Sequence, residues 1–275
     1  MTDHYGVIGH PISHSKSPRI HAEFARQTGQ DLDYVALDAP LDGFVPAVLD
    51  FRAHGGRGLN VTVPFKEAAY RLCATRTERA QAAGAVNTLS LSPEGIAGDN
   101  TDGAGLVRDL QQNLGFPLKG MRICLLGAGG AARGVLKPLL LEAPSRLLLV
   151  NRTPAKARAL QAAAGHPQTL GAGGFDDLAG ERFDLVINAT AASLADELPP
   201  LPEDLFAQGA AAYDMMYGRE TPFLRFARAH GAGLAADGIG MLVEQAAESF
   251  FIWRRVRPST RALIRTLAAQ AAERA

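Results

Sequence analysis

The stretch from Met121 to Arg152 constrains the possible fold more than any other part of the chain. Two short apolar runs, 123–126 and 147–150, flank the turn Gly127-Ala128-Gly129-Gly130-Ala131-Ala132 and a helix-like segment over 133–141. Short apolar runs bounded by glycines are typical of buried parallel strands, which lose the alternation of half-exposed strands. The order strand, glycine turn, helix, strand predicts a Rossmann-type nucleotide-binding unit.

The glycine turn is the part of this unit that suits a dinucleotide. Gly127 allows the tight turn, Gly129 lets the backbone approach a pyrophosphate, and Ala132 allows close packing of helix on strand. The free amides at the helix start then face the phosphates, aided by the positive end of the helix dipole. A glycine turn alone can be an ordinary loop, but this one follows a strand and opens a helix, as the fingerprint requires.

The end of the second strand indicates which dinucleotide is bound. An NAD site usually places a carboxylate there for the ribose 2′-hydroxyl, whereas an arginine accommodates a 2′-phosphate. The strand ends in Asn151-Arg152-Thr153, with Lys156 soon after and no carboxylate at the tip. The alternative is that Arg152 and Lys156 are ordinary solvated charges. The pattern favours NADP over NAD.

Composition excludes several other classes of protein. Lys plus Arg and Asp plus Glu each number 28, so no general basic field favours a nucleic-acid partner. Cys73 and Cys124 form no disulfide framework, and neither they nor the seven scattered histidines have metal-ligand spacing. No apolar run approaches the ~20 residues that span a bilayer, and residues 1–9 show no basic-then-apolar signal. We therefore expect a cytoplasmic protein without a metal or a membrane anchor.

The rest of the chain alternates between strand-like and helix-like patterns, which predicts an α/β fold. Strands are predicted over 5–9, 32–36, 59–63, 87–91, 96–98, 183–190, 210–214 and 234–237. Helices are predicted over 19–28, 44–54, 66–75, 77–83, 103–114, 154–164, 221–230, 241–253 and 259–272.

Several polar residues stand where either structure or binding could explain them. Ser15 and Ser17, in a loop before a helix, could cap that helix or present two hydroxyls to a ligand. Asn60 and Thr62 share one face of a strand, because side chains alternate with period two. Lys66 begins a helix, where its charge opposes the dipole; this hints at function, although most lysines are solvated surface charges.

Nine segments in one order along the chain resemble the motifs of the shikimate dehydrogenase family over almost the full length. They are His14-Ser15-Lys16-Ser17-Pro18, Asn60-Val61-Thr62-Val63-Pro64-Phe65-Lys66, Gly84-Ala85-Val86-Asn87-Thr88, Gly98-Asp99-Asn100-Thr101-Asp102-Gly103, the 127–132 turn, Asn151-Arg152-Thr153, Asn188-Ala189-Thr190, Asp214-Met215-Met216-Tyr217 and 238–245. Any one match could arise by chance, but nine in order are specific.

The resemblance implies a two-domain α/β protein with a cleft between an N-terminal α/β substrate domain and a Rossmann-type NADP domain. The substrate domain is expected over 1–103 and 239–275, and the NADP-binding domain over 104–238. The implied reaction is the reversible NADPH-linked reduction of 3-dehydroshikimate to shikimate in aromatic amino acid biosynthesis, the chorismate pathway. A monomer or homodimer is expected.

The resemblance also assigns site residues. The residues implied for the substrate are Ser15, Ser17, Asn60, Thr62, Lys66, Asn87, Asp102, Tyr217 and Gln245. Those implied for the cofactor are Glu78, Gly127, Ala128, Gly129, Gly130, Ala131, Asn151, Arg152, Thr153, Lys156, Met215 and Gly238. Lys66 and Asp102 are the implied catalytic pair. A carbonyl under reduction develops negative charge on its oxygen, which a nearby ammonium stabilises and can protonate. Whether Lys66 carries the proton or only anchors charge stays open at this point.

The sequence departs from the family pattern in one place, because Ala191-Ala192-Ser193 replaces a segment that commonly holds a glycine. This segment is expected to border the nicotinamide pocket, so the departure bears on cofactor affinity.

Two other functions compete with the first. One is a quinate/shikimate dehydrogenase of relaxed specificity, and the other is a non-catalytic NADPH-binding regulator that has kept the fold. The intact Lys66 and Asp102 argue against the regulator.

Overall fold

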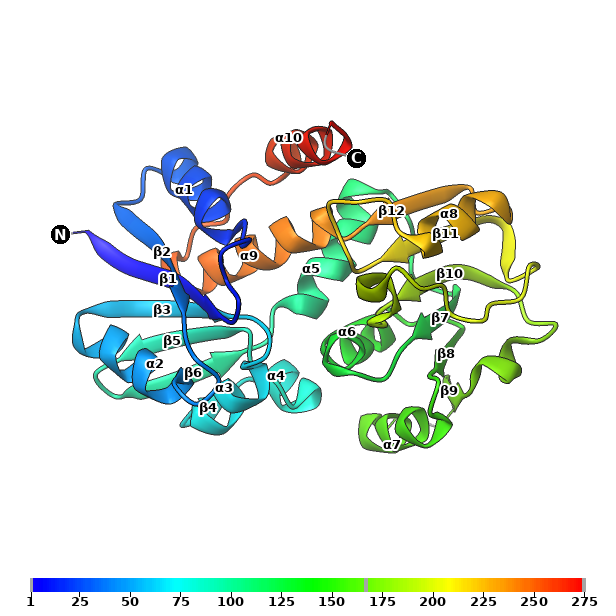
Figure 1. Ribbon diagram of the computed structural model, residues 1–275, viewed down its shortest axis with the longest axis horizontal. Helices are drawn as coiled ribbons and strands as arrows, with labels where there is room; N and C mark the ends of the chain where they lie inside the picture. Colours follow the sequence, from blue (N-terminus) through cyan, green and yellow to red (C-terminus); the bar gives the residue numbers. More distant parts are fainter. Residues whose placement is uncertain (1, 166–167, 274–275) are drawn as a thin grey trace.

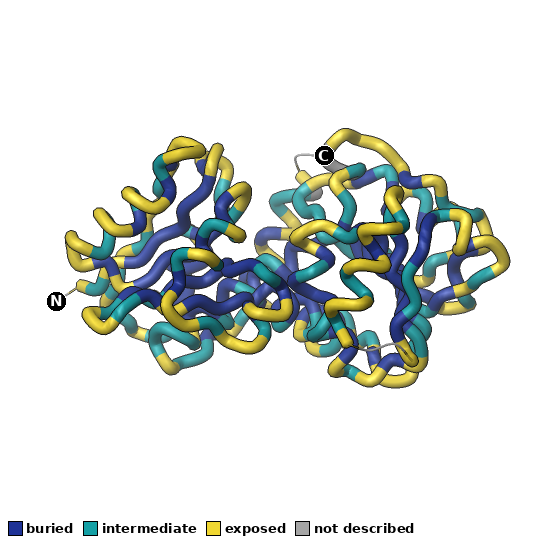
Figure 2. The backbone as a smooth tube through the Cα atoms, turned by 90° about the horizontal axis from the view of Figure 1, so that it is seen from below, coloured by how far each residue is buried: buried dark blue, intermediate teal, exposed yellow. Residues whose placement is uncertain are grey.

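The protein folds into two lobes, each built on a six-stranded sheet and joined by two long helical crossings (Figure 1). This computed structural model describes residues 2–165 and 168–273, apart from the side chains of Ser193, Leu194 and Ala272. Buried backbone runs through the centre of both lobes, and exposed segments form their rims (Figure 2). The predicted α/β class is confirmed.

The sheet of the first lobe is mixed. Its strands, in spatial order, are β2 (Leu32–Asp38), β1 (Asp3–Gly9), β3 (Gly56–Val61), β5 (Thr88–Ser92), β6 (Gly95–Asp99) and β4 (Thr75–Arg76). The first three strands are parallel to one another. Strand β5 pairs antiparallel with β3, and β5 and β6 form the predicted antiparallel hairpin. The helices of this lobe are α1 (Ser17–Thr28), α2 (Phe44–Ala53), α3 (Lys66–Leu72) and α4 (Glu78–Ala83).

The sheet of the second lobe is parallel throughout. In spatial order it contains β12 (Leu234–Asp237), β11 (Phe206–Asp214), β10 (Phe183–Asn188), β7 (Arg122–Leu126), β8 (Arg146–Val150) and β9 (Leu170–Gly173). Its helices are α6 (Gly130–Leu141), α7 (Pro154–Ala164) and α8 (Pro222–Ala229), with single 3₁₀ turns at Phe175–Leu178 and Ala192–Ala195. The strand order runs outward in opposite directions from the neighbouring strands β7 and β10. Open α/β sheets bind ligands at such a switch point.

The apolar runs that predicted this sheet are buried on both faces. Ile123 and Leu125 of β7 pack in the core beneath α6, whereas Cys124 and Leu126 pack on the other face against α8. Because successive strand residues point to opposite faces, the central positions of a strand covered on both sides are mostly apolar. Full burial of such side chains contributes about 1.5–3 kcal/mol each before chain entropy is counted.

Two helices cross between the lobes and pack on each other. The first is α5 (Asp102–Arg108), which continues into a π-helical turn at Asp109–Asn113, and the second is α9 (Ile239–Arg254). A Cβ on Gly105 would lie 2.7 Å from the Gln245 Cβ and 2.8 Å from its backbone nitrogen, so only glycine allows this approach. The last helix, α10 (Arg261–Ala272), packs back onto α9. This crossing brings the start of α5 and the middle of α9 to the same site.

Two helix predictions were wrong at their C-terminal ends, and one strand of the second lobe was not predicted. The helix predicted over 66–75 ends at Leu72, because Thr75 and Arg76 pair with β6 as β4. The helix predicted over 103–114 is α-helical only to Arg108 and then widens into the π turn. Strand β9 was not predicted, because its sequence Leu-Gly-Ala-Gly lacks β-branched residues and gains its order from pairing with β8.

Candidate active site

A cavity of about 670 Å³ lies between the two lobes. Both lobes contribute to its wall, through the end of β3, the first residues of α3, α5 and α6, and the middle of α9. All nine residues predicted to bind substrate line it: Ser15, Ser17, Asn60, Thr62, Lys66, Asn87, Asp102, Tyr217 and Gln245. The cavity therefore gathers residues that lie up to 230 positions apart, from Ser15 to Gln245.

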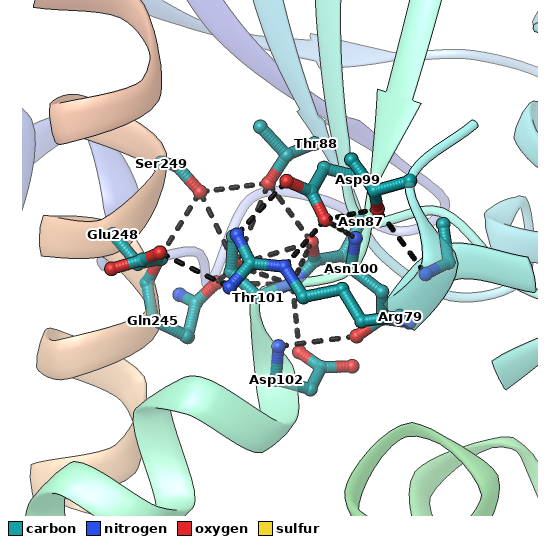
Figure 3. A network of polar contacts seen from close by, with 12 residues as sticks. Arg79, Asn87, Thr88, Asp99, Asn100, Thr101, Asp102, Gln245, Glu248 and Ser249 are labelled. Atoms are coloured by element: carbon teal, nitrogen blue, oxygen red, sulfur yellow. Dashed lines mark hydrogen bonds and ion pairs between the residues drawn. The ribbon is translucent and has the colours of Figure 1, made fainter. Parts of the chain in front are cut away.

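Lys66 and Asp102 meet inside this cavity. The Lys66 ammonium donates to Asp102 Oδ2 at 2.6 Å, and Asn87 Nδ2 donates to Asp102 Oδ1 at 2.8 Å. The backbone N–H of Asp102 donates to Asn100 Oδ1 at 3.1 Å, which fixes the start of α5 (Figure 3). Asp102 is 7% exposed, and its carboxylate occupies the first turn of α5, where the helix dipole favours an anion. The lysine is thus held beside a buried carboxylate that accepts a hydrogen bond at each of its two oxygens.

Short hydroxyl and amide side chains surround this pair. Asn60 is the next-to-last residue of β3 and Thr62 follows the strand, so period two places both at the cavity. Ser15 Oγ accepts the backbone N–H of Ser17 at 3.3 Å, and both serines also line the cavity. The capping residue of α1 is Lys16, whose side chain makes no capping hydrogen bond. Ser15 therefore stabilises the start of α1, and both Ser15 and Ser17 face the cavity.

The second lobe and α9 complete the wall with Tyr217 and Gln245. Burial raises the pKa of the Tyr217 phenol, so the hydroxyl stays protonated and can donate a hydrogen bond. Gln245 Nε2 donates to the Leu242 carbonyl at 2.9 Å, while its Oε1 accepts from Asn87 Nδ2 at 3.3 Å. Both long side chains are thereby directed at the same space as Lys66 and Asp102.

The glycine turn fits a phosphate group. Gly127 has φ +108°, and a Cβ there would lie 2.8 Å from the Ala189 carbonyl oxygen, so the tight turn requires glycine. A Cβ on Gly129 or Gly130 would meet no atom within 4 Å, so open space lies above these residues. They begin the 12-residue helix α6, whose first amides have no intrahelical acceptor. A dinucleotide's pyrophosphate fits this open space.

A second cavity, of about 870 Å³, adjoins the first along Gly129 and Ala189–Ala191. The predicted cofactor residues that line it are Gly127, Ala128, Gly129, Asn151, Arg152, Thr153 and Lys156. Arg152 and Lys156 are exposed, and neither forms an ion pair with any residue that the structure describes. Asn151 Nδ2 donates to the Thr153 carbonyl at 2.9 Å, which shapes the turn that presents Arg152. Two cationic side chains that follow β8 and have no ion-pair partner among the described residues suit the binding of a ribose phosphate.

The remaining predicted cofactor residues divide between the site and its surroundings. Gly130, Ala131, Met215 and Gly238 line the first cavity, and a Cβ on Gly238 would lie 2.5 Å from the Met215 carbonyl oxygen. Glu78 is exposed in the first turn of α4 and lines neither cavity. Its prediction as a cofactor contact therefore rests on the resemblance alone.

The segment that departs from the family pattern borders both cavities through Ala191. Thr190 Oγ1 donates to Asn188 Oδ1 at 2.7 Å and accepts the Ala192 N–H at 3.3 Å, which holds the segment to the end of β10. The 3₁₀ turn Ala192–Ala195 follows without a glycine. The side chain of Ser193 lies outside the described part of the structure.

Sequence reasoning missed several residues around the site. Glu67 lines the first cavity and pairs with Arg133 at 3.3 Å, an exposed ion pair that joins α3 of one lobe to α6 of the other. Thr101 and Ser249 lie behind the cavity, fully buried and hydrogen-bonded to residues that line it. The sequence held a signal for Ser249, because it follows Gln245 by four residues and so shares its helix face.

Within residues 2–165 and 168–273, no group of three His, Cys, Asp or Glu side chains is arranged to hold a metal ion. Over the same residues, no helix is long and apolar enough to cross a membrane. A glycine-turn unit beside a cavity that holds hydroxyl and amide side chains and a lysine–carboxylate pair instead defines the class of two-lobed α/β nucleotide-binding proteins.

Comparison with family models narrows this class. The model of the shikimate dehydrogenase substrate binding domain matches residues 7–89, and that of shikimate / quinate 5-dehydrogenase matches residues 109–195. The model of the shikimate 5′-dehydrogenase C-terminal domain matches residues 238–268. The three models follow one another along the chain in the order of the predicted motifs.

Relatives and solved structures agree with these matches. The chain is 62% identical over 272 residues to a shikimate dehydrogenase (NADP(+)) of Aromatoleum aromaticum, covering 98% of each chain. It aligns at TM-score 0.93 and 50% identity with an Ael1 enzyme from Pseudomonas putida, covering 97% of this chain and 98% of that one. It also aligns at TM-score 0.85 and 33% identity with the Thermus thermophilus shikimate 5-dehydrogenase in complex with NADP(H) and shikimate, covering 98% and 100%. The chain belongs to the shikimate dehydrogenase family.

Proposed function

We propose that this protein catalyses the reversible reduction of 3-dehydroshikimate to shikimate with NADPH, a step of the chorismate pathway. The observation that carries the proposal is the Lys66–Asp102 pair at 2.6 Å, inside a cavity that adjoins an open glycine turn. Support also comes from the 62% identical relative, which is named for this activity and cofactor.

The proposed chemistry divides between cofactor and protein. The bound nicotinamide supplies the hydride in reduction and accepts it in oxidation. Lys66 gives its ammonium proton to the carbonyl oxygen as the oxygen gains charge, and in the reverse direction its neutral amine takes the hydroxyl proton. Asp102 holds the amine in place and bonds the same hydroxyl. The 2.6 Å contact supports this positioning role.

The other residues of the first cavity are proposed to bind the substrate. Shikimate carries one carboxylate and three hydroxyls, so its site needs short hydroxyl and amide groups. A site that hydrogen-bonds each hydroxyl rejects analogues that lack one, because its own buried groups are then left unpaired. The proposed substrate residues are Ser15, Ser17, Asn60, Thr62, Asn87, Tyr217 and Gln245, all of which line the cavity.

The second cavity is proposed to hold the adenosine half of NADP. The free amides at the start of α6 bind the pyrophosphate, and Arg152 meets the 2′-phosphate as a planar fork, with Lys156 as an additional charge. The exposure of both cations, and their lack of ion-pair partners within the described residues, support this role. Met215 and Gly238 are proposed to border the nicotinamide.

We further propose that residues 1–103 and 239–275 form the substrate domain, and residues 104–238 the NADP domain. Packing of α9 and α10 against Ile20 and Phe24 of α1 supports the discontinuous division. A cytoplasmic monomer or homodimer without a nucleic-acid partner is proposed as well, which the equal numbers of basic and acidic residues support.

One spectrophotometric experiment tests the function. Purified protein is mixed with shikimate or quinate and with NADP or NAD, and reduction of the cofactor is followed. We expect the highest kcat/KM with shikimate and NADP. Faster oxidation of quinate with NAD would favour the quinate/shikimate alternative. Tight NADPH binding without any turnover would favour the non-catalytic regulator.

A further inference from the structure

A buried polar network lies behind the first cavity and joins β3, β5, the start of α5 and α9. Figure 3 shows its members Thr88, Thr101 and Ser249 close together. Its hydroxyl members are Thr88, Thr101 and Ser249, each of which is fully buried. None of the three lines the cavity, so none contacts a ligand there. Their partners Asn60 and Asn87 do line it, which raises the question of what the hydroxyls do for these two amides.

Backbone partners identify which atom of each amide side chain faces which neighbour. Asn87 Oδ1 receives the backbone N–H of Thr101 at 2.9 Å, and an N–H can only donate, so the oxygen must face it. Asn60 Nδ2 lies 3.2 Å from the Asn87 carbonyl oxygen, which can only accept, so the nitrogen must face that side. Asn60 Oδ1 is then the atom that accepts the Tyr34 hydroxyl at 2.7 Å.

The orientation of Asn87 determines the direction of the hydrogen bonds between hydroxyls. Thr88 Oγ1 lies 2.9 Å from Asn87 Oδ1, an acceptor, so Thr88 donates its single hydrogen there. Ser249 Oγ lies 2.8 Å from Thr88 Oγ1, and two oxygens this close need a hydrogen between them, so Ser249 donates. The 3.1 Å contact from Ser249 Oγ to the Gln245 carbonyl is the longer branch of the same hydroxyl.

A directed chain of hydrogen bonds results. Asn60 Nδ2 donates to Ser249 Oγ at 2.9 Å, Ser249 to Thr88, and Thr88 to Asn87. The opposite side of the Asn87 amide then donates its N–H to Asp102 Oδ1 at 2.8 Å. The direction of each hydrogen bond determines the direction of the next, because each hydroxyl has a single hydrogen to donate. Consecutive hydrogen bonds of this kind strengthen one another in a buried setting.

We propose that Ser249 and Thr88 are positioning residues for the reaction: their hydroxyls keep the cavity-facing amides of Asn60 and Asn87 in one orientation. Without them, each amide loses a hydrogen bond that favours its present orientation, so the turned orientation, with oxygen and nitrogen exchanged, becomes more populated. A hydroxylated substrate would then meet a mispaired group, and Asp102 would lose a donor. This inference rests on the proposed function, because the expected effect is measured as a change in the KM for shikimate.

The test compares Ser249→Ala with the native protein and with Ala247→Gly. Ala247 lies on α9, is fully buried and packs in the apolar cluster, so its change perturbs the same helix without touching the network. We expect Ser249→Ala to raise the KM for shikimate about 5- to 20-fold, the range for one mispaired hydrogen-bonding group between cavity and substrate. The KM for NADP should change less than twofold, and Ala247→Gly should lower Tm while leaving both constants unchanged.

A second pair of variants tests the same chain at Thr88. Thr88→Val removes the hydroxyl at constant shape and should raise the shikimate KM as Ser249→Ala does, whereas Thr88→Ser keeps the hydroxyl and should stay near native. Equal changes in the two substrates' KM values, or a Ser249→Ala enzyme with native shikimate KM, would overturn the positioning role. So would a Thr88→Ser variant that is impaired as strongly as Thr88→Val.

A readout without substrate separates this inference from the proposed function. In isotope-labelled protein, the side-chain amide signals of Asn60 and Asn87 should be sharp in the native and Thr88→Ser forms, and broadened in Ser249→Ala. Native protein that fails to turn over shikimate would refute the function while these signals still decide the inference. Sharp, unshifted signals in Ser249→Ala would refute the inference alone.

Discussion

The substrate side and the cofactor side of the cleft are built on opposite plans. On the substrate side, side chains are held by other side chains: Lys66 by Asp102, and Asp102 by Asn87. On the cofactor side, the glycine turn presents bare backbone and open space, and Arg152 and Lys156 have no ion-pair partner among the described residues. Removing one side chain on the substrate side should therefore leave its neighbours without a hydrogen-bond partner. Removing one on the cofactor side should only remove its own contact with the ligand.

This difference follows from what each side has to recognise. Hydroxyls on a small ring must be matched one by one, so their partners need fixed directions before binding. Phosphates are bound through charge and through amides that already point outward at a helix start, so less preparation is needed. The four predictions below test the contrast, from the largest expected effect to the smallest.

The largest effect is expected on the substrate side, at Lys66. Lys66→Ala should lower kcat by about 10²- to 10⁴-fold, the range for loss of a general acid–base group, while the shikimate KM changes little. Stopped-flow measurement of NADPH formation and shikimate titration would check both constants. Lys119→Ala is a matched control, because Lys119 is exposed and lines neither cavity. A kcat within threefold of native would remove Lys66 from the chemistry.

Arg152 should give the next largest effect, confined to one cofactor. Arg152→Ala should raise the KM for NADP about 10- to 100-fold through loss of a charge-assisted contact with the 2′-phosphate, and leave the KM for NAD nearly unchanged. Arg158→Ala, an exposed arginine of the same helix α7 that lines neither cavity, is the control. Equal losses for NADP and NAD would contradict the phosphate role.

A third effect should appear in acid stability, because the substrate side contains a buried histidine. His21 stacks on Tyr34, which bonds Asn60, and burial lowers the pKa of His21 to about 3 from its usual 6.5. Between these values the unfolded chain binds a proton that the folded protein does not. Stability should therefore fall as pH drops below 6.5, by about 1.4 kcal/mol per unit from this group.

The chain offers a built-in probe for this pH dependence. Its single tryptophan, Trp253, has its ring centroid 5.6 Å from that of His21, so its fluorescence reports on this part of the protein. Urea unfolding at several pH values should show the acid loss in the native protein and a flatter profile in His21→Phe, which keeps the stack but cannot titrate. Parallel profiles for the two proteins would exclude His21 as the source.

The smallest effect is expected at Lys156. Lys156→Ala should raise the NADP KM only about two- to fivefold, because an exposed flexible ammonium contributes little to binding. The double variant with Arg152→Ala should multiply the two single effects, since neither cation is tied to a described neighbour. A double effect far from that product would mean that the cofactor side is interlocked after all.

The sequence alone determined the local parts of this fold. Two apolar runs around a glycine turn predict a buried parallel sheet, because a strand covered on both faces carries apolar residues at most of its positions. The identity and order of the motifs predicted which residues belong to the site, and the nine substrate candidates do line one cavity. Strand β9 was not predicted, because pairing with β8 imposes it rather than its own residues, and the π turn after Arg108 was not predicted either.

Only the tertiary structure decided how distant residues meet and which way their hydrogen bonds run. Lys66 and Asp102 are 36 residues apart, and Asn60 and Ser249 are 189 apart, so no local pattern relates them. Part of this arrangement depends on Gly105, which lets α5 press against α9 and so brings the start of α5, with Asp102, to the middle of α9, near Ser249. Long-range packing of this kind fixes the site's geometry, whereas short-range periodicity can fix only the elements that carry it.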